Sequence, residues 1–327
     1  MRTRSESSDA GVLACAATIA ARPADRHRVI LIGGSTARRR ATAMGVIVAG
    51  SISPPLGIAR AAARNALAAV TAVGEPDVLC GWSAGCAAIL EESDGFGGIR
   101  IAIDPASGGA LILSGRRATA TPTEPPPPAA WFSKHPAAAA EIAEPSPRIA
   151  LVGNAPGDVD VGLLIGVISL LRVAGVRGAV GIADPLSPGW RRAGRIEAEM
   201  LGAGCFVAAE APPAAMGNGA SYVVIGNGGP YARAMLAAAA ASRGLIPVAG
   251  GDGLIDSVLP PELVAPSSDA PALARLLLEL IEDAGRRTTA TERLRTNLAQ
   301  QAGGVSAWFG AALGESKGAA AAEMQSR

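Results

Sequence analysis

Hydrophobic residues along this chain form two kinds of pattern, short continuous runs and longer stretches with helical spacing. Short apolar runs bounded by glycine, proline or polar residues predict buried strands. Apolar residues that recur every three or four positions predict amphipathic helices. In the first half of the chain, strands are predicted at 28–32, 45–49, 77–80, 99–103 and 110–113, and helices at about 56–73 and 84–91. Strands that alternate with helices favour a parallel sheet with helices on both faces.

The same alternation starts afresh in the second half. Strands are predicted at 148–153, 179–182, 205–208, 222–225 and 244–251, and helices at about 163–171, 231–242, 270–283 and 291–313. Asp269 is placed to cap the third of these helices, and Pro271 fits its first turn. The apolar face of that helix consists of Leu273, Leu276, Leu277, Leu280 and Ile281. The pattern as a whole predicts the α/β class, with a second α/β domain following the first.

Proline-rich stretches divide the chain. Residues 119–128 end in four successive prolines and are expected to form an extended surface segment outside any sheet or helix. A second break at 145–147 marks the expected domain boundary. We therefore predict a flexible leader at 1–25, domains at 26–146 and 147–314, and a flexible tail at 315–327.

Composition narrows the class of protein. Apolar residues make up 49% and charged residues 17%, which favours a well-buried globular chain over a disordered one. A net charge of +1 and 3% aromatic residues argue against nucleic acid as a partner. Four scattered cysteines and two histidines show no metal-ligand spacing.

No apolar run reaches the roughly 18 residues of a membrane span, so no transmembrane segment is expected. Acidic residues Glu6 and Asp9 stand ahead of the weakly apolar stretch 11–17, which argues against a secretory signal peptide. We therefore expect a cytoplasmic protein. Peripheral association with a membrane is compatible with this composition.

Two glycine turns follow predicted strands and are candidates for ligand contact. Gly33 and Gly34 end the first strand, the usual opening of a doubly wound domain, and Gly228 and Gly229 follow the strand at 222–225. Glycine lets backbone amides come close to a ligand, but the same residues also serve simple tight turns. The nearby run of arginines at 38–40 is more typical of a solvated surface than of a phosphate clamp.

Three stretches carry a resemblance to a known family. Residues 151–165 read as strand, loop and helix, 222–251 as strand, glycine turn, helix and strand, and 264–273 as strand, turn and helix. Together they resemble the C-terminal half of a retaining, family 4-type glycosyltransferase of the GT-B fold. The resemblance implies two Rossmann-like doubly wound domains facing each other, with a nucleotide-sugar donor between them. It implies transfer of the sugar to an acceptor that it does not identify, with neither a cofactor nor an obligatory metal.

The chain departs from this family at its charged positions. Family members carry an arginine and a lysine where this chain has Asn154 and Val159. Those cations would neutralise the diphosphate leaving group, which Asp158 would repel. The family also carries two glutamates, expected near 231–232 and 239–240, but no glutamate lies between Glu210 and Glu262. These losses favour an alternative, a non-catalytic binding or assembly module with the GT-B fold.

The resemblance implies five substrate-binding residues, and none of them is assigned a catalytic role. They are Asn154, Asp158, Gly228, Gly229 and Tyr231. Gly33 and Gly34 are added to the predicted substrate-binding residues because their turn can bring backbone amides close to a phosphate.

A second motif points to different chemistry. Residues 81–85, Gly-Trp-Ser-Ala-Gly, match the nucleophile elbow of an α/β-hydrolase, with Ser83 as the nucleophile. Asp104 and His135 follow in the order that such a triad requires, which leaves a serine hydrolase as a further alternative. The other interpretation is that small residues let the following helix pack closely, with Ser83 as its cap.

Overall fold

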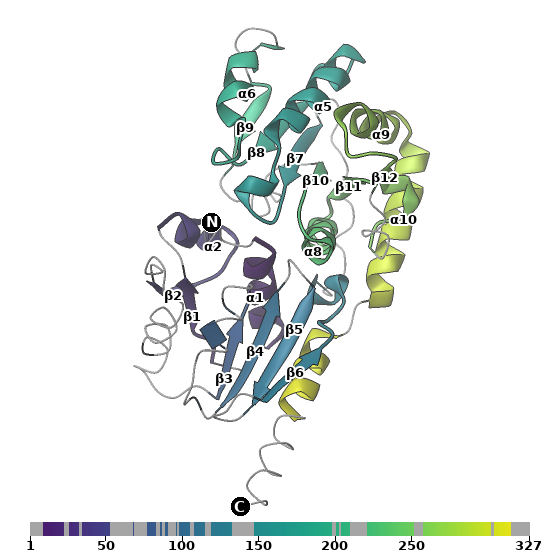
Figure 1. Cartoon of the computed structure of the whole chain (residues 1–327). Coiled ribbons are helices and arrows are strands. Elements are labelled where there is room, and N and C mark those ends of the chain that lie inside the picture. The colour runs from purple at the N-terminus through teal and green to yellow at the C-terminus, as the bar shows by residue number, and fades with distance from the viewer. Residues whose placement is uncertain are drawn as a thin grey trace, which may run out of the picture. The chain divides into compact units, whose positions relative to one another are not determined.

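The computed structural model describes most of the chain (Figure 1), and its contacts divide the chain into two compact units, Met1–Pro127 with Gly303–Arg327, and Pro128–Ala302. The residues described are 9–22, 26–32, 35–52, 68, 77–82, 86, 89–90, 96, 98–104, 108–114, 119–132, 147–197, 201–202, 204–209, 221–251, 258–301 and 304–314. The predicted domain ranges 26–146 and 147–314 remain a prediction. The expected tail at 315–327 and most of the helices expected at 56–73 and 84–91 lie outside the described residues.

The first unit begins with helix α1 (Asp9–Ala21), which lies within the range 1–25 predicted as a leader. The flexibility of that leader stays a prediction. Helix α1 is followed by β1 (Val29–Ile32), α2 (Ser35–Ala43) and β2 (Val48–Ile52), and the two strands pair in parallel. Arg40 of α2 forms an ion pair of 2.5 Å with Asp9, and both side chains are only 2% exposed. The expectation of a solvated arginine run is therefore wrong for Arg40, because a pairing carboxylate offsets the desolvation of its charge.

A four-stranded sheet follows, in the order β3 (Val78–Gly81), β4 (Ile99–Asp104), β5 (Gly109–Ser114) and β6 (Thr119–Thr123). Strands β3 and β4 are parallel, whereas β5 and β6 are added antiparallel, so the parallel sheet expected here is only partly correct. The proline-rich segment also joins the sheet, contrary to expectation, with Pro122 opposite Leu111. Proline is accommodated at an edge strand because only one side of such a strand must supply ladder hydrogen bonds.

The second unit contains a six-stranded sheet that is parallel throughout. Its strands in spatial order are β12 (Val264–Ala265), β11 (Ile246–Gly250), β10 (Tyr222–Ile225), β7 (Arg148–Val152), β8 (Val180–Ala183) and β9 (Phe206–Ala208). In chain order this is 6-5-4-1-2-3, the doubly wound arrangement, and the direction of winding reverses between β7 and β10. The predicted strands of the second half are confirmed.

The hydrophobic pattern predicted the helices near 163–171, 231–242 and 270–283 correctly, but it missed the helix at 190–196 and wrongly extended the last helix to 313, although residue 304 is not helical. Helices cover this sheet. They are α5 (Val161–Val173), α6 (Trp190–Ile196), α8 (Pro230–Ala241), α9 (Ala270–Glu282) and α10 (Ala284–Gln301), with the 3-10 helices η1 (Pro128–Phe132), η2 (Pro156–Asp158) and η4 (Pro261–Leu263). Asp269 caps α9 by accepting a hydrogen bond of 2.8 Å from the amide of Ala272, as expected. The predicted face of α5 is partly wrong, because Leu170 is 41% exposed while Ile165 and Ile168 are buried.

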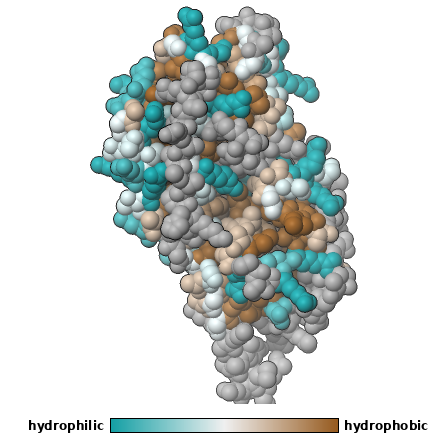
Figure 2. Space-filling view, turned by 180° about the vertical axis from the view of Figure 1, so that it is seen from behind, coloured by the Kyte–Doolittle hydropathy of each residue, from teal (hydrophilic) through white to brown (hydrophobic). Residues whose placement is uncertain are grey.

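Helix α8 is the most enclosed helix of this unit. Residues 232–241 are all buried, and seven of these ten are alanines. The helix packs against η1, α10 and the strands β10 and β11 (Figure 1). Small side chains allow such close approach of neighbouring backbones. On the face that Figure 2 shows, hydrophilic residues lie beside hydrophobic ones. No helix among the described residues is both long and apolar enough to cross a membrane.

Candidate functional site

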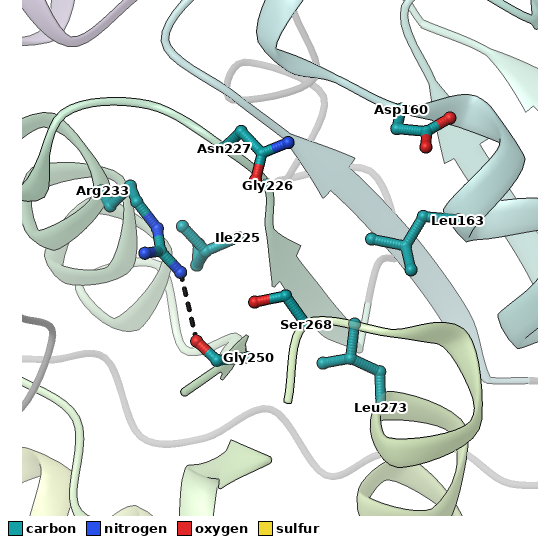
Figure 3. Close-up of a pocket in the computed structure, with 9 residues that line it drawn as sticks. All are labelled: Asp160, Leu163, Ile225, Gly226, Asn227, Arg233, Gly250, Ser268 and Leu273. Atoms are coloured by element: carbon teal, nitrogen blue, oxygen red, sulfur yellow. Dashed lines mark hydrogen bonds between the residues drawn. The ribbon is translucent and has the colours of Figure 1, made fainter. Parts of the chain in front are cut away.

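A pocket of about 80 Å³ lies at the carboxyl ends of β10 and β11 in the second unit (Figure 3). The strands contribute their last residues, Ile225 and Gly250, and the N-terminal parts of α5, α8 and α9 supply the remaining walls. Its lining residues are Asp160, Leu163, Ile225, Gly226, Asn227, Arg233, Gly250, Ser268 and Leu273. Open parallel sheets bind ligands at this edge, next to the point where the winding reverses. The pocket is therefore the candidate site.

Arg233 is the cation of this pocket, the only one among its nine lining residues. It lies on α8, is 6% exposed, and its Nη2 donates a hydrogen bond of 3.3 Å to the carbonyl oxygen of Gly250. Sequence reasoning missed this residue. The available signal was its place as the one charged residue in the otherwise apolar helix 231–242.

The glycine turn after β10 brings two connections of the sheet together. Gly228 has a φ of 140°, which favours glycine, and a Cβ at this position would lie 3.7 Å from Asn154 and 3.8 Å from both Arg233 and Asp158. The adjacent amide of Asn227 donates to the carbonyl of Asp158 at 3.2 Å. The structure therefore places three of the sequence-predicted residues, Asn154, Asp158 and Gly228, beside one another and next to Arg233.

In the loop between β7 and α5, two carboxylates accept hydrogen bonds from nearby backbone amides. Oδ2 of Asp158 accepts a hydrogen bond of 3.1 Å from the amide of Ala155. Asp160 is the N-cap of α5, and its Oδ1 accepts a hydrogen bond of 2.8 Å from the amide of Gly162. Val159, at the position of the family's lysine, is buried. This loop therefore satisfies its own backbone donors with Asp158 and Asp160, in a segment where the family would present cations to a ligand.

The turn between β10 and α8 ends differently. Gly229 is the N-cap of α8 and Pro230 follows it, so the helix begins with a residue that has no side chain to cap with. The first backbone amides of a helix have no partner within it, and the helix dipole favours negative charge there. The end of α8 next to the pocket is thus suited to an anion.

Tyr231 lies in the first turn of α8 but is not one of the residues that line the pocket. Its hydroxyl accepts a hydrogen bond of 2.7 Å from Nε1 of Trp131 in η1. Burial raises the pKa of the Tyr231 hydroxyl well above its usual value, and the bond from Trp131 lowers it by less. This hydrogen bond links η1 to the first turn of α8.

The positions where the family carries its glutamates are closed to solvent. Ala232, Ala239 and Ala240 are 0% exposed within the packed surface of α8. An ionised carboxylate at such a position would lose its hydration, which strongly raises its free energy. The alanines are therefore consistent with a helix whose role is packing.

The remaining predicted residues lie outside the part of the chain that the structure describes. They are Gly33, Gly34, Ser83 and His135, and the hydrolase motif built on Ser83 stays a prediction. Asp104, its candidate acid, is the last residue of β4. Within the described residues, no three histidine, cysteine or acidic side chains gather closely enough to hold a metal ion.

We compared the chain with known protein families, curated proteins and solved structures to identify its fold. No family model matches the chain, and no curated protein matches it. Among solved structures it is similar to a protein assigned as a UDP-N-acetylglucosamine 2-epimerase from Listeria monocytogenes, with a TM-score of 0.50 and 8% identity over 87% of each chain. The chain has a GT-B fold. An α,α-trehalose-phosphate synthase (UDP-forming) from Burkholderia xenovorans aligns over 93% of this chain and 77% of its own, with 14% identity and a TM-score of 0.39.

Proposed function

We propose that this chain binds a nucleotide-sugar donor at the pocket beside β10 and β11, and transfers the sugar to an acceptor with retention of configuration, as family 4 glycosyltransferases do. The observation that carries the proposal is the position of the pocket. It lies at the carboxyl edge of a doubly wound sheet, beside the glycine turn 226–229 and the N-termini of two helices. A nucleoside diphosphate leaving group needs hydrogen-bond donors where its charge develops.

Calorimetry with a panel of nucleoside diphosphates and nucleotide sugars tests binding directly. A donor at about 100 times its Kd should raise the stability of the native protein by about 2.7 kcal/mol, which a thermal-shift measurement detects. Release of nucleoside diphosphate that depends on an added acceptor would establish transfer, and the anomeric configuration of the product would establish retention. Absence of both binding heat and thermal stabilisation across the panel would refute the proposal.

The glycine turn offers a matched pair of variants for the same test. Gly228→Ala strains a turn that borders the pocket, whereas Gly175→Ala strains a residue with a φ of 104° and open space around it, just beyond the C-terminal end of α5. Both should cost about 1 kcal/mol of folding stability, because alanine disfavours a positive φ. Only Gly228→Ala should also weaken donor binding. Equal donor affinity in the two variants would argue against a ligand at this turn.

The second candidate, a non-catalytic binding or assembly module, is favoured by one observation. Buried alanines occupy the expected glutamate positions, and buried Val159 occupies the expected lysine position, so the chain presents neither kind of charge at those places. This candidate predicts donor binding in calorimetry with neither transfer nor hydrolysis of the donor. Turnover by the purified protein would exclude it.

A further inference from the structure

We propose that one face of the second unit docks the protein on an anionic membrane surface, with arginines at the lipid headgroups and apolar side chains in the interface. This face, which we call the α5–α6 face, is formed by the exposed sides of α5 and α6 and by the turns that follow α5 and precede α6. Its residues are Val173, Arg177, Leu186, Arg191, Arg192 and Arg195. Docking at this face does not require the proposed donor site.

Positive charge is concentrated in the stretch that forms this face. Residues 161–196 contain five arginines and one acidic residue, Asp184, which is buried, although the whole chain has a net charge of only +1. The exposed charged side chains of this stretch are Arg177, Arg191, Arg192 and Arg195. None of these four forms an ion pair within the described part of the chain. A surface of this kind attracts an anionic partner.

The fold turns the arginines of α6 away from the core. Ala193 is buried, and Arg191 and Arg195, two positions to either side of it, share the opposite side of the helix because residues four apart are neighbours on a helix surface. Helices α5 and α6 pack against each other and connect successive parallel strands, which places both on the same side of the sheet (Figure 1). Arg172 of α5 donates a hydrogen bond of 2.6 Å to the carbonyl of Leu201, so the end of α5 is held beside the segment that follows α6.

Apolar side chains are exposed at both ends of this arginine cluster. Val173, the last residue of α5, is 86% exposed, and Leu186, in the turn before α6, is 54% exposed. Trp190, the first residue of α6, is half-buried. The interface of a bilayer accepts this mixture, because apolar and tryptophan side chains enter it while arginines bind the anionic headgroups. Nucleic acid would attract the arginines but gain little from the aliphatic side chains, so a membrane is the favoured partner.

Helix α9 sets a limit to the docked surface. It also packs against α5, but its C-terminal end carries exposed Glu282, followed by exposed Asp283. Anionic lipids repel these carboxylates. The docked surface should therefore extend over α6 rather than over α9.

Co-sedimentation of the full chain with vesicles tests the proposal, using phosphatidylcholine alone and phosphatidylcholine mixed with phosphatidylglycerol. The protein should bind only the mixed vesicles, and binding should weaken as salt rises. The double variant Arg191→Gln, Arg195→Gln should weaken this binding roughly tenfold or more. The control double variant Arg275→Gln, Arg286→Gln removes the same charge from α9 and α10 and should leave binding within about threefold.

The apolar contribution has its own matched pair. Val173→Ser should weaken vesicle binding about threefold, because the apolar side chain no longer enters the interface. Ile47→Ser alters a side chain that is 88% exposed in the first unit, and it should leave binding within about twofold. Both side chains are exposed, so both variants should fold as the original protein does.

The outcomes separate membrane docking from the proposed function. Absence of binding to the mixed vesicles at low salt overturns the proposal and leaves the donor site standing. Binding that the control pair on α9 and α10 weakens as much as the pair on α6 overturns the assignment to this face. If soluble polyglutamate binds the chain while the vesicles do not, the partner is an acidic protein and the membrane is refuted. Vesicle binding with the expected dependences supports the proposal even where calorimetry finds no nucleotide-sugar binding.

Discussion

Two connections meet at the carboxyl edge of the second unit's sheet, and they use their polar groups in opposite ways. The loop after β7 turns its carboxylates onto its own backbone, with Asp158 accepting from Ala155 and Asp160 capping α5. The turn after β10 consists of glycines and Asn227, and it leads into a helix that brings Arg233 to the pocket.

Both connections also differ in charge from the corresponding connections of the family that the sequence resembles. In the resembling family the first connection supplies the cations, and here it supplies none at Asn154 and Val159. In that family the second connection supplies two glutamates, whereas in this chain it supplies an arginine within an alanine-rich helix. Introducing the family's residues one at a time therefore tests whether each connection can accept them without loss of folding stability.

The largest effect is expected for Ala239→Glu in α8. Its site is 0% exposed, so the new carboxylate must be buried or force the helix out of its place. The free energy of unfolding should fall by about 3 kcal/mol or more, measured by urea denaturation. The matched control is Ala299→Glu at an exposed position of α10, which should stay within about 0.5 kcal/mol of the original protein. Equal stability of the two variants would show that α8 still has room for the family's carboxylate.

A smaller loss is expected for Val159→Lys in the loop after β7. Val159 is 3% exposed, but lysine has a long apolar stem that can carry its ammonium group towards solvent. The free energy of unfolding should fall by about 2 kcal/mol in the same assay. Val159→Met, which keeps an apolar side chain of similar length, separates the effect of charge from that of size. If the two variants lose the same stability, charge burial at this loop is not the cause.

A gain of binding is expected for Asn154→Arg. Asn154 is only half-buried and lies beside Gly228, so an arginine here can extend towards the pocket with little loss of packing. Affinity for a nucleoside diphosphate should rise severalfold, and Asn154→Gln provides a neutral control of similar polarity. Calorimetry at two salt concentrations checks the origin of the gain, because an electrostatic gain should shrink as salt rises.

The smallest effect concerns the cap of α9 at the same edge. The pKa of Asp269 lies below its usual value, because its carboxylate accepts hydrogen bonds from the Ala272 amide and then from the Ser267 hydroxyl. A lowered pKa in the folded state means that the cap stabilises the fold above the unfolded pKa of about 3.9, and that this is lost as pH falls through the folded value. The stability difference between the original protein and Asp269→Ala should therefore be greatest near neutral pH and shrink in acid. A difference that stays constant between pH 7 and pH 2 would contradict this account.

The sequence pattern was sufficient to predict an element whose stripe and cap both lie within one short stretch of the chain. The apolar stripe of α9 and its cap at Asp269 lie within one stretch of sequence, and both were predicted correctly. The same reasoning failed for Leu170, because spacing defines a stripe but not how far the neighbouring elements extend over it. It also failed for Pro122, since whether a strand is central or at an edge depends on its neighbours.

By itself, the sequence determined the α/β class, the strands and the helices α5, α8 and α9 of the second unit, and the glycine turn that follows β10. These follow from short apolar runs, from the helical period of 3.6 residues and from the backbone freedom of glycine, all of which act over a few neighbouring positions. Only the tertiary structure decided that Asp160, Arg233 and Ser268, far apart along the chain, line one pocket. It also decided that Arg40 is buried against Asp9. Such pairings depend on the order of strands in a sheet and on what covers each side chain, which no local pattern specifies.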